Sequence, residues 1–396
     1  MTKFLTVSNV YKAISLQKYL DKEPLYVRLA QDRHKPNMKV AIALTDQSFQ
    51  RTKSMGIFNV SMGLAKGLMN CPEVTELHIL GNNECGDAFR NCPPHVHVHL
   101  TDKPVPRRFA RVWWDQFGLC AAVRKIKPDW VILPKGVPPF FPRFGKAKMA
   151  CYVHDVMWEH YEQRSATDRK GPFPWHELLY FRNLSLRAMK ISDLVLTHTQ
   201  FNASRILHYV PQARIARIGI GYDDTPPATE PDTPKRDVLT YASTFPHKCT
   251  PLTLQRISAW LKTREDGKNI RIHVVGSMPA DLPLPDAGWI HHARIPYAEL
   301  RTLLQDKCRM AVYFSDYESY GMPPVECLLN GVPCVASDIP PIRENIPAQY
   351  LFNNADEADF IAKANAAYDK KHPFICPEFP TWQEVCNRCV QAMLQH

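Results

Sequence analysis

The sequence has 396 residues, of which 45% are hydrophobic and 22% charged, as expected for a folded protein with room for two domains. No apolar run reaches the about 18 residues that a membrane-spanning helix requires. The opening segment, MTKFLTVSNVYKAISLQ, lacks the apolar core of a signal peptide. We therefore expect a cytoplasmic protein.

The formal net charge of +10 is concentrated in the first part of the chain. Residues 1–150 contain 23 Lys and Arg against 11 Asp and Glu (+12), whereas the remainder contains 26 against 28 (−2). The densest basic section includes Arg107, Arg108 and Arg111. Such a face can meet an anionic membrane, an acidic acceptor or nucleic acid, or it can be a solvated surface without a partner. No zinc finger or RNP motif is present, so nucleic acid is not the expected partner.

The first half of the chain alternates apolar and amphipathic segments. After a lead over 1–37, short apolar runs predict buried strands, and patterns such as FARVWWDQFGLCAAVRKI predict helices between them. The strands are expected at 39–44, 76–81, 129–134, 149–155 and 193–199. Strand alternating with helix indicates a parallel sheet covered on both faces. We therefore predict an α/β domain over 38–222.

A segment rich in Pro, Asp and Thr, residues 223–237, predicts a linker. The alternation restarts after it with the apolar runs VLTYA, IRIHVVG and MAVYFS, which predict a second α/β domain over 238–375. Two open α/β sheets joined by a linker leave a cleft, and ligands bind such sheets at the carboxyl ends of the strands.

Candidate site residues follow several of these strands. They are Gly56 in the loop after the first strand, His154 with Asp155, His247 with Lys248, Gly276 with Ser277, and Glu318. Because strand ends of one sheet meet at one edge, we expect these loops to border the cleft. His154 can alternatively be a satisfied strand-end histidine, and Lys248 a solvated loop cation.

The segment DYESYGMPPVECLLNGVPCVAS, residues 316–337, places Glu318 on a loop and Glu326 on a short helix. Pro323 suits a first helical position and Gly331 a helix stop, so the helix is expected over 323–330. Two carboxylates can accept hydrogen bonds from two pairs of vicinal hydroxyls, those of a sugar and of a ribose. N–H groups at the helix start would face a diphosphate. Glu326 can alternatively serve only the helix dipole.

These motifs resemble those of retaining GT-B glycosyltransferases of family GT4. Glu318 to Glu326 matches the family's E-x7-E signature, and LLNGVPCVASDIPPIREN continues the pattern. WWDQ, VHD, THTQFNASRIL, GIGYDD, HK and YAELRTLLQDK follow in order, and TWQEVC is similar to the family's terminal helix. The resemblance covers about residues 38–390. It implies two Rossmann-like parallel-sheet domains facing across a cleft, with a C-terminal helix over 376–396 packing back towards the first domain.

The resemblance also implies roles for the candidate residues. Glu318 would bind donor-sugar hydroxyls, Glu326 the ribose, Lys248 the diphosphate, and His154 would lie beside the reacting sugar. The remaining donor contacts would come from Gly56, His247, Gly276, Ser319, Tyr320, Gly321 and Met322. Ser319 stands where the family usually has Gly, which would tune the sugar pocket. His247 stands where the family more often has Arg, and the loop near Gly56 has one glycine rather than several, which would weaken phosphate binding or make it depend on pH.

The reaction implied is transfer of a hexose from a nucleoside-diphosphate sugar to a hydroxyl, with retention of anomeric configuration and without a metal ion. The mannosyltransferase-like branch is the nearest pattern, so GDP-mannose is the first expected donor and a UDP-sugar the second. The acceptor would be a glycan or a lipid-linked saccharide, with peripheral membrane contact through the basic first domain. The alternatives are a catalytically weak nucleotide-sugar-binding protein of the same fold and a basic nucleic-acid-binding protein. A dehydrogenase would need a G-x-G-x-x-G turn that is absent after KVAIAL.

The cysteines are scattered without regular spacing, which is typical of buried thiols in a reducing compartment. Cys386 and Cys389 form the one close pair. Together with Cys376 and His372 they could bind zinc, although two thiols at helical spacing is the favoured interpretation.

Overall fold

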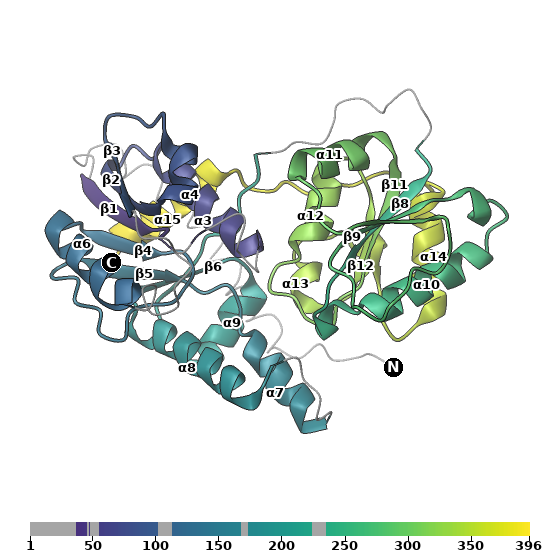
Figure 1. The fold of residues 1–396 in the computed structure, drawn as a ribbon, viewed down its shortest axis with the longest axis horizontal. Helices are drawn as coiled ribbons and strands as arrows, with labels where there is room; N and C mark the ends of the chain where they lie inside the picture. Colours follow the sequence, from purple (N-terminus) through teal and green to yellow (C-terminus); the bar gives the residue numbers. More distant parts are fainter. Residues whose placement is uncertain (1–36, 46, 48–54, 102–112, 168–172, 224–234) are drawn as a thin grey trace, which may run out of the picture.

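The computed structural model describes residues 37–396 except 46, 48–54, 102–112, 168–172 and 224–234. Most of the expected N-terminal extension and linker, and the arginines 107, 108 and 111, therefore lie outside the described residues. Figure 1 shows two α/β lobes side by side. Within the described residues, no helix is long and apolar enough to cross a membrane.

The first lobe is built on a parallel sheet with the strand order β3-β2-β1-β4-β5-β6-β7. Its strands are β1 Met38–Ala43, β2 Val74–Asn82, β3 Val96–Thr101, β4 Trp130–Leu133, β5 Lys148–Tyr152, β6 Leu194–Thr197 and β7 Ile215–Arg217. Its helices are α3 Met55–Leu68, α4 Asn83–Gly86, α6 Leu119–Ile126, α7 Met157–Thr167, α8 Trp175–Ile191 and α9 Gln200–Tyr209, with a π-helical turn over Trp114–Gly118 and a 3-10 turn over Asp87–Phe89. The central strand β4 is apolar and buried throughout, as expected for a parallel sheet with helices on both faces, and its neighbours β1 and β5 are apolar except for Lys39 and Lys148.

The second lobe repeats this plan with the strand order β10-β9-β8-β11-β12-β13, again all parallel. Its strands are β8 Asp237–Ala242, β9 Ile272–Gly276, β10 Trp289–His292, β11 Cys308–Tyr313, β12 Cys334–Ser337 and β13 Leu351–Phe352. Its helices are α10 Thr250–Lys262, α11 Tyr297–Asp306, α12 Met322–Leu329, α13 Pro340–Arg343 and α14 Glu357–Tyr368, with 3-10 turns over Pro246–Lys248, Gly267–Asn269 and Ala348–Tyr350. The predicted α/β class with two parallel sheets is confirmed.

The last helix, α15 Trp382–Leu394, packs against α3 of the first lobe. Gly63 and Gly67 permit this approach, because a Cβ atom there would lie 2.1 Å from the Trp382 ring and 2.5 Å from the Cys386 Sγ. Cys386 and Cys389 are both fully buried on α15. They are helix-packing residues, and within the described chain neither belongs to a converging group of three metal ligands.

The chain crosses between the lobes twice, and the two crossing segments touch. The Tyr222 N–H donates to the Pro380 carbonyl over 2.8 Å. The linker expected to end at 237 ends earlier, because Asp237 is already the first residue of β8. Its carboxylate is held by the His273 ring at 3.0 Å, which ties the start of β8 to β9.

Candidate active site

Lys248 and Glu318 lie side by side at the strand-end edge of the second sheet. Lys248 closes the 3-10 turn after β8, and Glu318 lies on the loop after β11. The Lys248 Nζ donates to the Glu318 carboxylate and, over 2.9 Å, to the Tyr313 hydroxyl. Tyr313 in turn donates to the same carboxylate over 2.5 Å. The Lys248 side chain is 25% exposed and that of Glu318 10%, so this charged cluster is shielded and still open to a ligand.

Helix α12 begins directly after this loop. Gly321, with φ +86°, is its N-cap, because the chain must take a left-handed turn there to enter the helix. The helix consequently starts at Met322, one residue before the predicted start. A Cβ atom on Gly56 would lie 3.3 Å from the Met322 Sδ. The N-terminal ends of α3 and α12 therefore lie close together across the lobes, and the positive dipole ends of two helices are near each other there.

Gly56 does not lie in a loop, contrary to prediction. It is the second residue of α3, which begins at Met55. The predicted loop placement overlooked that Met55 and Gly56 continue the helical pattern of the following residues. Gly56 still reaches the site, as the close approach to Met322 shows.

Glu326 lies in the second turn of α12 and is partly buried. Its carboxylate is one of the causes that raise the pKa values of Tyr313 and Tyr222, after burial and nearer groups. The charge of Glu318 also raises the pKa of Tyr313. Both glutamates of the E-x7-E motif, one on the loop and one on the helix, therefore raise the pKa of the same tyrosine, Tyr313.

His154 follows β5 and is held in a neutral state. Its Nε2–H donates to the Pro134 carbonyl over 2.6 Å, and its ring packs on Tyr152 with 4.6 Å between ring centroids. Burial lowers the pKa of His154 to about 4, against a small opposing effect of the Pro134 carbonyl. Asn202 positions this strand end by donating to the Val153 and His154 carbonyls. Nδ1 is therefore the acceptor nitrogen of His154 at neutral pH.

The strand end that carries His154 lies against the loop that carries Glu318. The Val156 N–H donates to the Tyr317 hydroxyl over 3.3 Å. Burial raises the pKa of Asp155, and the Glu318 carboxylate adds to this effect while Lys248 opposes it. The structure thus brings the strand end that carries His154, through Asp155 and Val156, close to Lys248 and the Glu318 loop of the other lobe.

His247, in the same 3-10 turn as Lys248, is buried against the first lobe. It is 5% exposed, and its Nδ1 is hydrogen-bonded to the Tyr161 hydroxyl of the first lobe, with 2.5 Å between the two atoms. Burial, with Lys248 nearby, lowers the pKa of His247 to about 3. The ring is therefore a neutral contact between the lobes, and its predicted contact with the diphosphate stays a prediction.

Ser319 and Tyr320, the two residues after Glu318, hold the glutamate loop in place through their backbone carbonyls. The Ser319 carbonyl accepts from the Thr199 hydroxyl over 2.9 Å, and the Tyr320 carbonyl accepts from the Asn345 side chain over 2.9 Å. The first of these bonds links the two lobes. Both carbonyls therefore stabilise the loop that carries Glu318.

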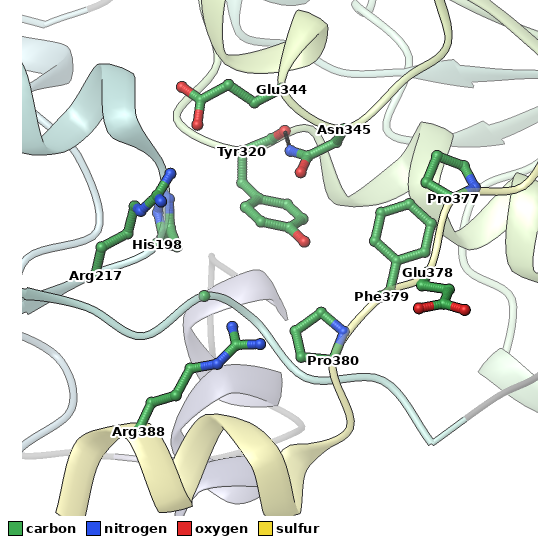
Figure 2. A pocket seen from close by; sticks show the side chains of 11 residues that line it. His198, Arg217, Tyr320, Glu344, Asn345, Pro377, Glu378, Phe379, Pro380 and Arg388 are labelled. Carbon is green, nitrogen blue, oxygen red and sulfur yellow. Dashed lines mark hydrogen bonds between the residues drawn. The ribbon is translucent and has the colours of Figure 1, made fainter. Parts of the chain in front are cut away.

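The Tyr320 side chain lines a cavity of about 440 Å³ between the lobes, at the crossing segments (Figure 2). Its lining includes His198, Arg217, Glu344 and Arg388, whereas Glu318, Lys248 and His154 do not line it. Glu344 accepts from the Gln200 and Phe201 N–H groups at 2.7 Å each, so it caps α9 across the lobes. This cavity lies beside the segments that cross between the lobes and is separate from the charged cluster.

Gly276 ends β9 with φ +113°. A Cβ atom there would lie 2.3 Å from the Ala242 carbonyl oxygen at the end of β8. Glycine is required for this approach of two strand ends, and the structure shows this packing role directly.

Two neighbours of the site were not predicted from the sequence: Tyr313 and Tyr161. Tyr313 ends an apolar strand and looks like a core residue, and Tyr161 lies on a helix 86 positions before its partner His247. Only the position of Tyr313, as the last residue before the glutamate loop, offered a signal.

Comparison with known families places the second lobe. Residues 236–370 match the family model described as "Glycosyl transferases group 1". The second lobe is a group 1 glycosyltransferase domain. The chain is also similar to the O-antigen chain mannosyltransferase RfbU of Salmonella typhimurium, with 24% identity over 230 residues. That match covers 54% of this chain and 63% of the length of RfbU.

Similar solved structures show the fold of the whole chain. The lipopolysaccharide outer core galactosyltransferase WaaB has a TM-score of 0.59 at 14% identity, covering 90% of this chain and 99% of WaaB. Sucrose-phosphate synthase from Thermosynechococcus elongatus has a TM-score of 0.58 at 12% identity, covering 91% of this chain and 94% of the synthase. HepE from Anabaena, in complex with UDP and glucose, has a TM-score of 0.53 at 14% identity, covering 90% of this chain and 95% of HepE. The chain has the GT-B fold.

Proposed function

We propose that the protein is a retaining glycosyltransferase that moves a hexose from a nucleoside-diphosphate sugar to a hydroxyl of a glycan or lipid-linked saccharide. The observation that carries this proposal is the cluster of Lys248, Glu318 and Tyr313 beside the start of α12. The group 1 glycosyltransferase domain supports the same reaction class. Mannose is the first choice of sugar, because RfbU is named a mannosyltransferase. GDP is the first choice of nucleotide and UDP the second.

Different parts of the donor would bind to different side chains of the charged cluster. The Lys248 ammonium would pair with the diphosphate, and the Glu318 carboxylate would accept hydrogen bonds from sugar hydroxyls. Glu326 would accept from the ribose hydroxyls. The neighbouring ends of α3 and α12, at Gly56 and Met322, would supply N–H groups to the phosphate oxygens.

In the transfer step, the bond between the anomeric carbon and the phosphate oxygen breaks while the acceptor oxygen bonds to the same face of that carbon. Negative charge then grows on the departing diphosphate, where Lys248 and the α12 N–H groups can stabilise it. The departing phosphate oxygen takes the proton of the acceptor hydroxyl. The neutral His154 would accept a hydrogen bond from a sugar hydroxyl through Nδ1. These cationic and N–H groups would do the work without a metal ion.

A donor panel tests the proposal. The protein is incubated with GDP-mannose, UDP-glucose and UDP-galactose and a hydroxyl acceptor, and nucleotide release is followed together with product NMR. The expected result is transfer from one donor, with the anomeric configuration of the donor preserved. Calorimetric binding of a donor without transfer or hydrolysis would instead favour a nucleotide-sugar-binding protein. An inverted product would reject the retaining reaction.

The acceptor would be presented by the first lobe, whose part of the chain carries the excess positive charge. We propose an acceptor attached to an anionic group, either a lipid diphosphate at a membrane surface or a charged glycan. About 1 kcal/mol per basic residue near an anionic membrane would suffice for peripheral attachment when several act together.

A further inference from the structure

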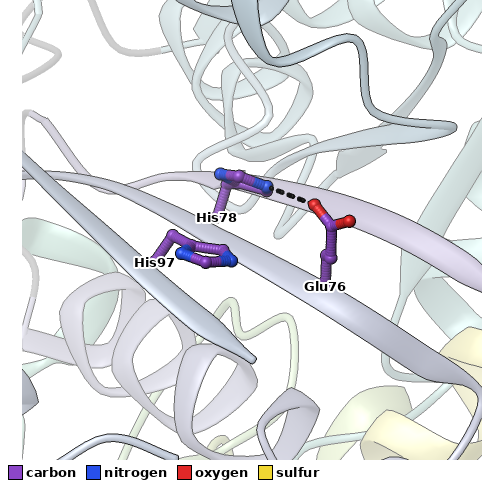
Figure 3. A group of neighbouring side chains, drawn as sticks. All are labelled: Glu76, His78 and His97. Carbon is purple, nitrogen blue, oxygen red and sulfur yellow. Dashed lines mark hydrogen bonds and ion pairs between the residues drawn. The ribbon is translucent and has the colours of Figure 1, made fainter. Parts of the chain in front are cut away.

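A second cluster of titratable side chains lies on the outer strands of the first lobe (Figure 3). One carboxylate oxygen of Glu76 and one ring nitrogen each of His78 and His97 all lie within 4.8 Å of one another, and the two imidazole rings stack with 4.8 Å between their centroids. Within the residues that the structure describes, no other group of three such side chains converges in this way. The candidate active site uses none of them.

The parallel pairing of β2 with β3 creates this cluster. His78 pairs directly with His97, and residues that pair in register point to the same face of a sheet. Glu76 lies two residues before His78 and His99 two residues after His97, so all four side chains share that face. The cluster lies towards the start of both strands, whereas the candidate active site lies beyond the carboxyl ends of the strands.

The geometry suits a tetrahedral cation with nitrogen and oxygen ligands. The Glu76 Oε2 and His78 Nε2 are 3.3 Å apart. Two ligands that bind Zn²⁺ at about 2.0–2.1 Å with tetrahedral angles are themselves separated by about 3.3–3.4 Å. His97 is exposed on the edge strand, so a change of rotamer can bring its ring to the third position.

His99 supplies the supporting contact that metal-binding histidines usually have. The His78 Nδ1 and the His99 Nε2 are 2.9 Å apart. When Nε2 of His78 binds a cation, its Nδ1 carries the proton and donates to His99, which fixes the tautomer and the orientation of the ring. His78 is 7% exposed, so its ring is already held by the sheet.

We propose that Glu76, His78 and His97 bind a divalent cation of the Zn²⁺ class, with water in the fourth position and His99 as the positioning residue. Bound metal would join the edge strand β3 to β2 and stabilise the first lobe. Lys39 on β1 competes for the site, because its Nζ lies 2.6 Å from the Glu76 Oε2. The cation must displace this ion pair.

The second lobe provides an internal control. There the Asp237 carboxylate contacts His273 at 3.0 Å, and His273 contacts His292 at 3.0 Å. This carboxylate–histidine–histidine chain has the same contacts, but within the described residues it belongs to no converging group of three ligands. His292→Ala should therefore leave metal binding unchanged.

The test titrates the untagged full-length protein with CoCl₂ and ZnCl₂ at pH 7.5, following the visible absorption of tetrahedral Co²⁺ and the thermal midpoint. We expect one site, with the Co²⁺ spectrum lost when Zn²⁺ is added and the midpoint raised by Zn²⁺. His97→Ala, an exposed change that should not disturb folding, should abolish the spectrum, and His99→Ala should weaken binding about 10- to 100-fold. Lys39→Ala should tighten binding.

No Co²⁺ spectrum in the wild type, or an unchanged spectrum in His97→Ala, would overturn the proposal. Tighter binding is expected only if Lys39 competes for the same carboxylate, so unchanged or weaker binding in Lys39→Ala would also count against it. An equal loss in His292→Ala would show that surface histidines bind the metal without a defined site.

Discussion

Replacing Lys248 by Met removes the cation at the centre of the candidate site and retains much of its apolar stem. In the unliganded protein this side chain contacts the Glu318 carboxylate and the Tyr313 hydroxyl. In the proposed donor complex it contacts the diphosphate instead. The variant therefore has two separate consequences, one for stability and one for transfer.

For transfer, the variant loses one charge-assisted contact, worth about 1.5–3 kcal/mol. Since about 1.4 kcal/mol corresponds to a factor of ten in rate, kcat/KM should fall about 10- to 150-fold. Part of this loss should appear in kcat, because the charge on the diphosphate grows as the glycosidic bond breaks.

For stability, the variant leaves Glu318 with Tyr313 as its remaining contact of that cluster. Breaking a fully buried ion pair costs about 3–5 kcal/mol, and the 25% exposure of the Lys248 side chain reduces this to about 1–2 kcal/mol. Adding Glu318→Gln removes the unpaired charge. The double variant should thus recover stability in urea unfolding while remaining inactive.

The assay is steady-state transfer with the active donor, calorimetric binding of the nucleoside diphosphate, and urea unfolding of each variant. Lys262→Met, at the exposed last turn of α10, is the matched control and should behave as the wild type. A kcat/KM within about twofold of the wild type in Lys248→Met would refute the assignment of this lysine to the diphosphate.

Three further predictions follow from the structure and the charge distribution. The protein should lose stability as pH falls from about 6.5 to 4. In the folded protein the pKa values of His154, His198 and His247 are about 4, 3 and 3, respectively. Because the same histidines have a pKa of about 6.5 in the unfolded chain, the unfolded chain binds protons first as pH falls. Each contributes at most about 1.4 kcal/mol per pH unit, and His198→Asn should reduce the slope measured by urea unfolding at pH 7, 6 and 5; an unchanged slope would contradict this. Transfer should survive EDTA even if the thermal midpoint falls, whereas complete loss with rescue by Mg²⁺ or Mn²⁺ would assign the phosphate to a metal. The protein should sediment with anionic but not neutral liposomes, with release by salt and weakening by the change of Arg107, Arg108 and Arg111 to Glu; no binding at low salt would favour a soluble acceptor.

The fold class was predictable because both lobes repeat one local signal. Apolar runs such as DWVILP became fully buried central strands, and the amphipathic segments between them became helices. The first residues of helices and strands were less predictable where the conformation or pairing of a single residue decides them. Gly321 starts α12 one residue early through its left-handed conformation, and Asp237 begins β8 because its backbone pairs with the start of β11.

The candidate site was predictable only where it follows strand ends. Glu318 and Lys248 were placed at one edge by the parallel topology, and the structure shows them in contact. The contact of His247 with Tyr161 depends on how the two lobes close, and no local pattern carries that information. Tyr313 was missed for a similar reason, since its hydroxyl reaches Glu318 only through the turn of the following loop.

The pairing of Lys248 with Glu318 determines which ligand groups the candidate donor site can bind. A carboxylate that is 10% exposed is poorly solvated and needs a partner, and the lysine provides it while no donor is present. A nucleotide sugar offers the lysine a diphosphate and the glutamate a pair of hydroxyls, so both groups exchange one partner for another. A free sugar would supply only the hydroxyls and leave the lysine without an anion to replace the carboxylate. We therefore infer that the diphosphate, more than the sugar, opens the pair, and that the protein should bind a nucleoside diphosphate measurably and the free hexose very weakly.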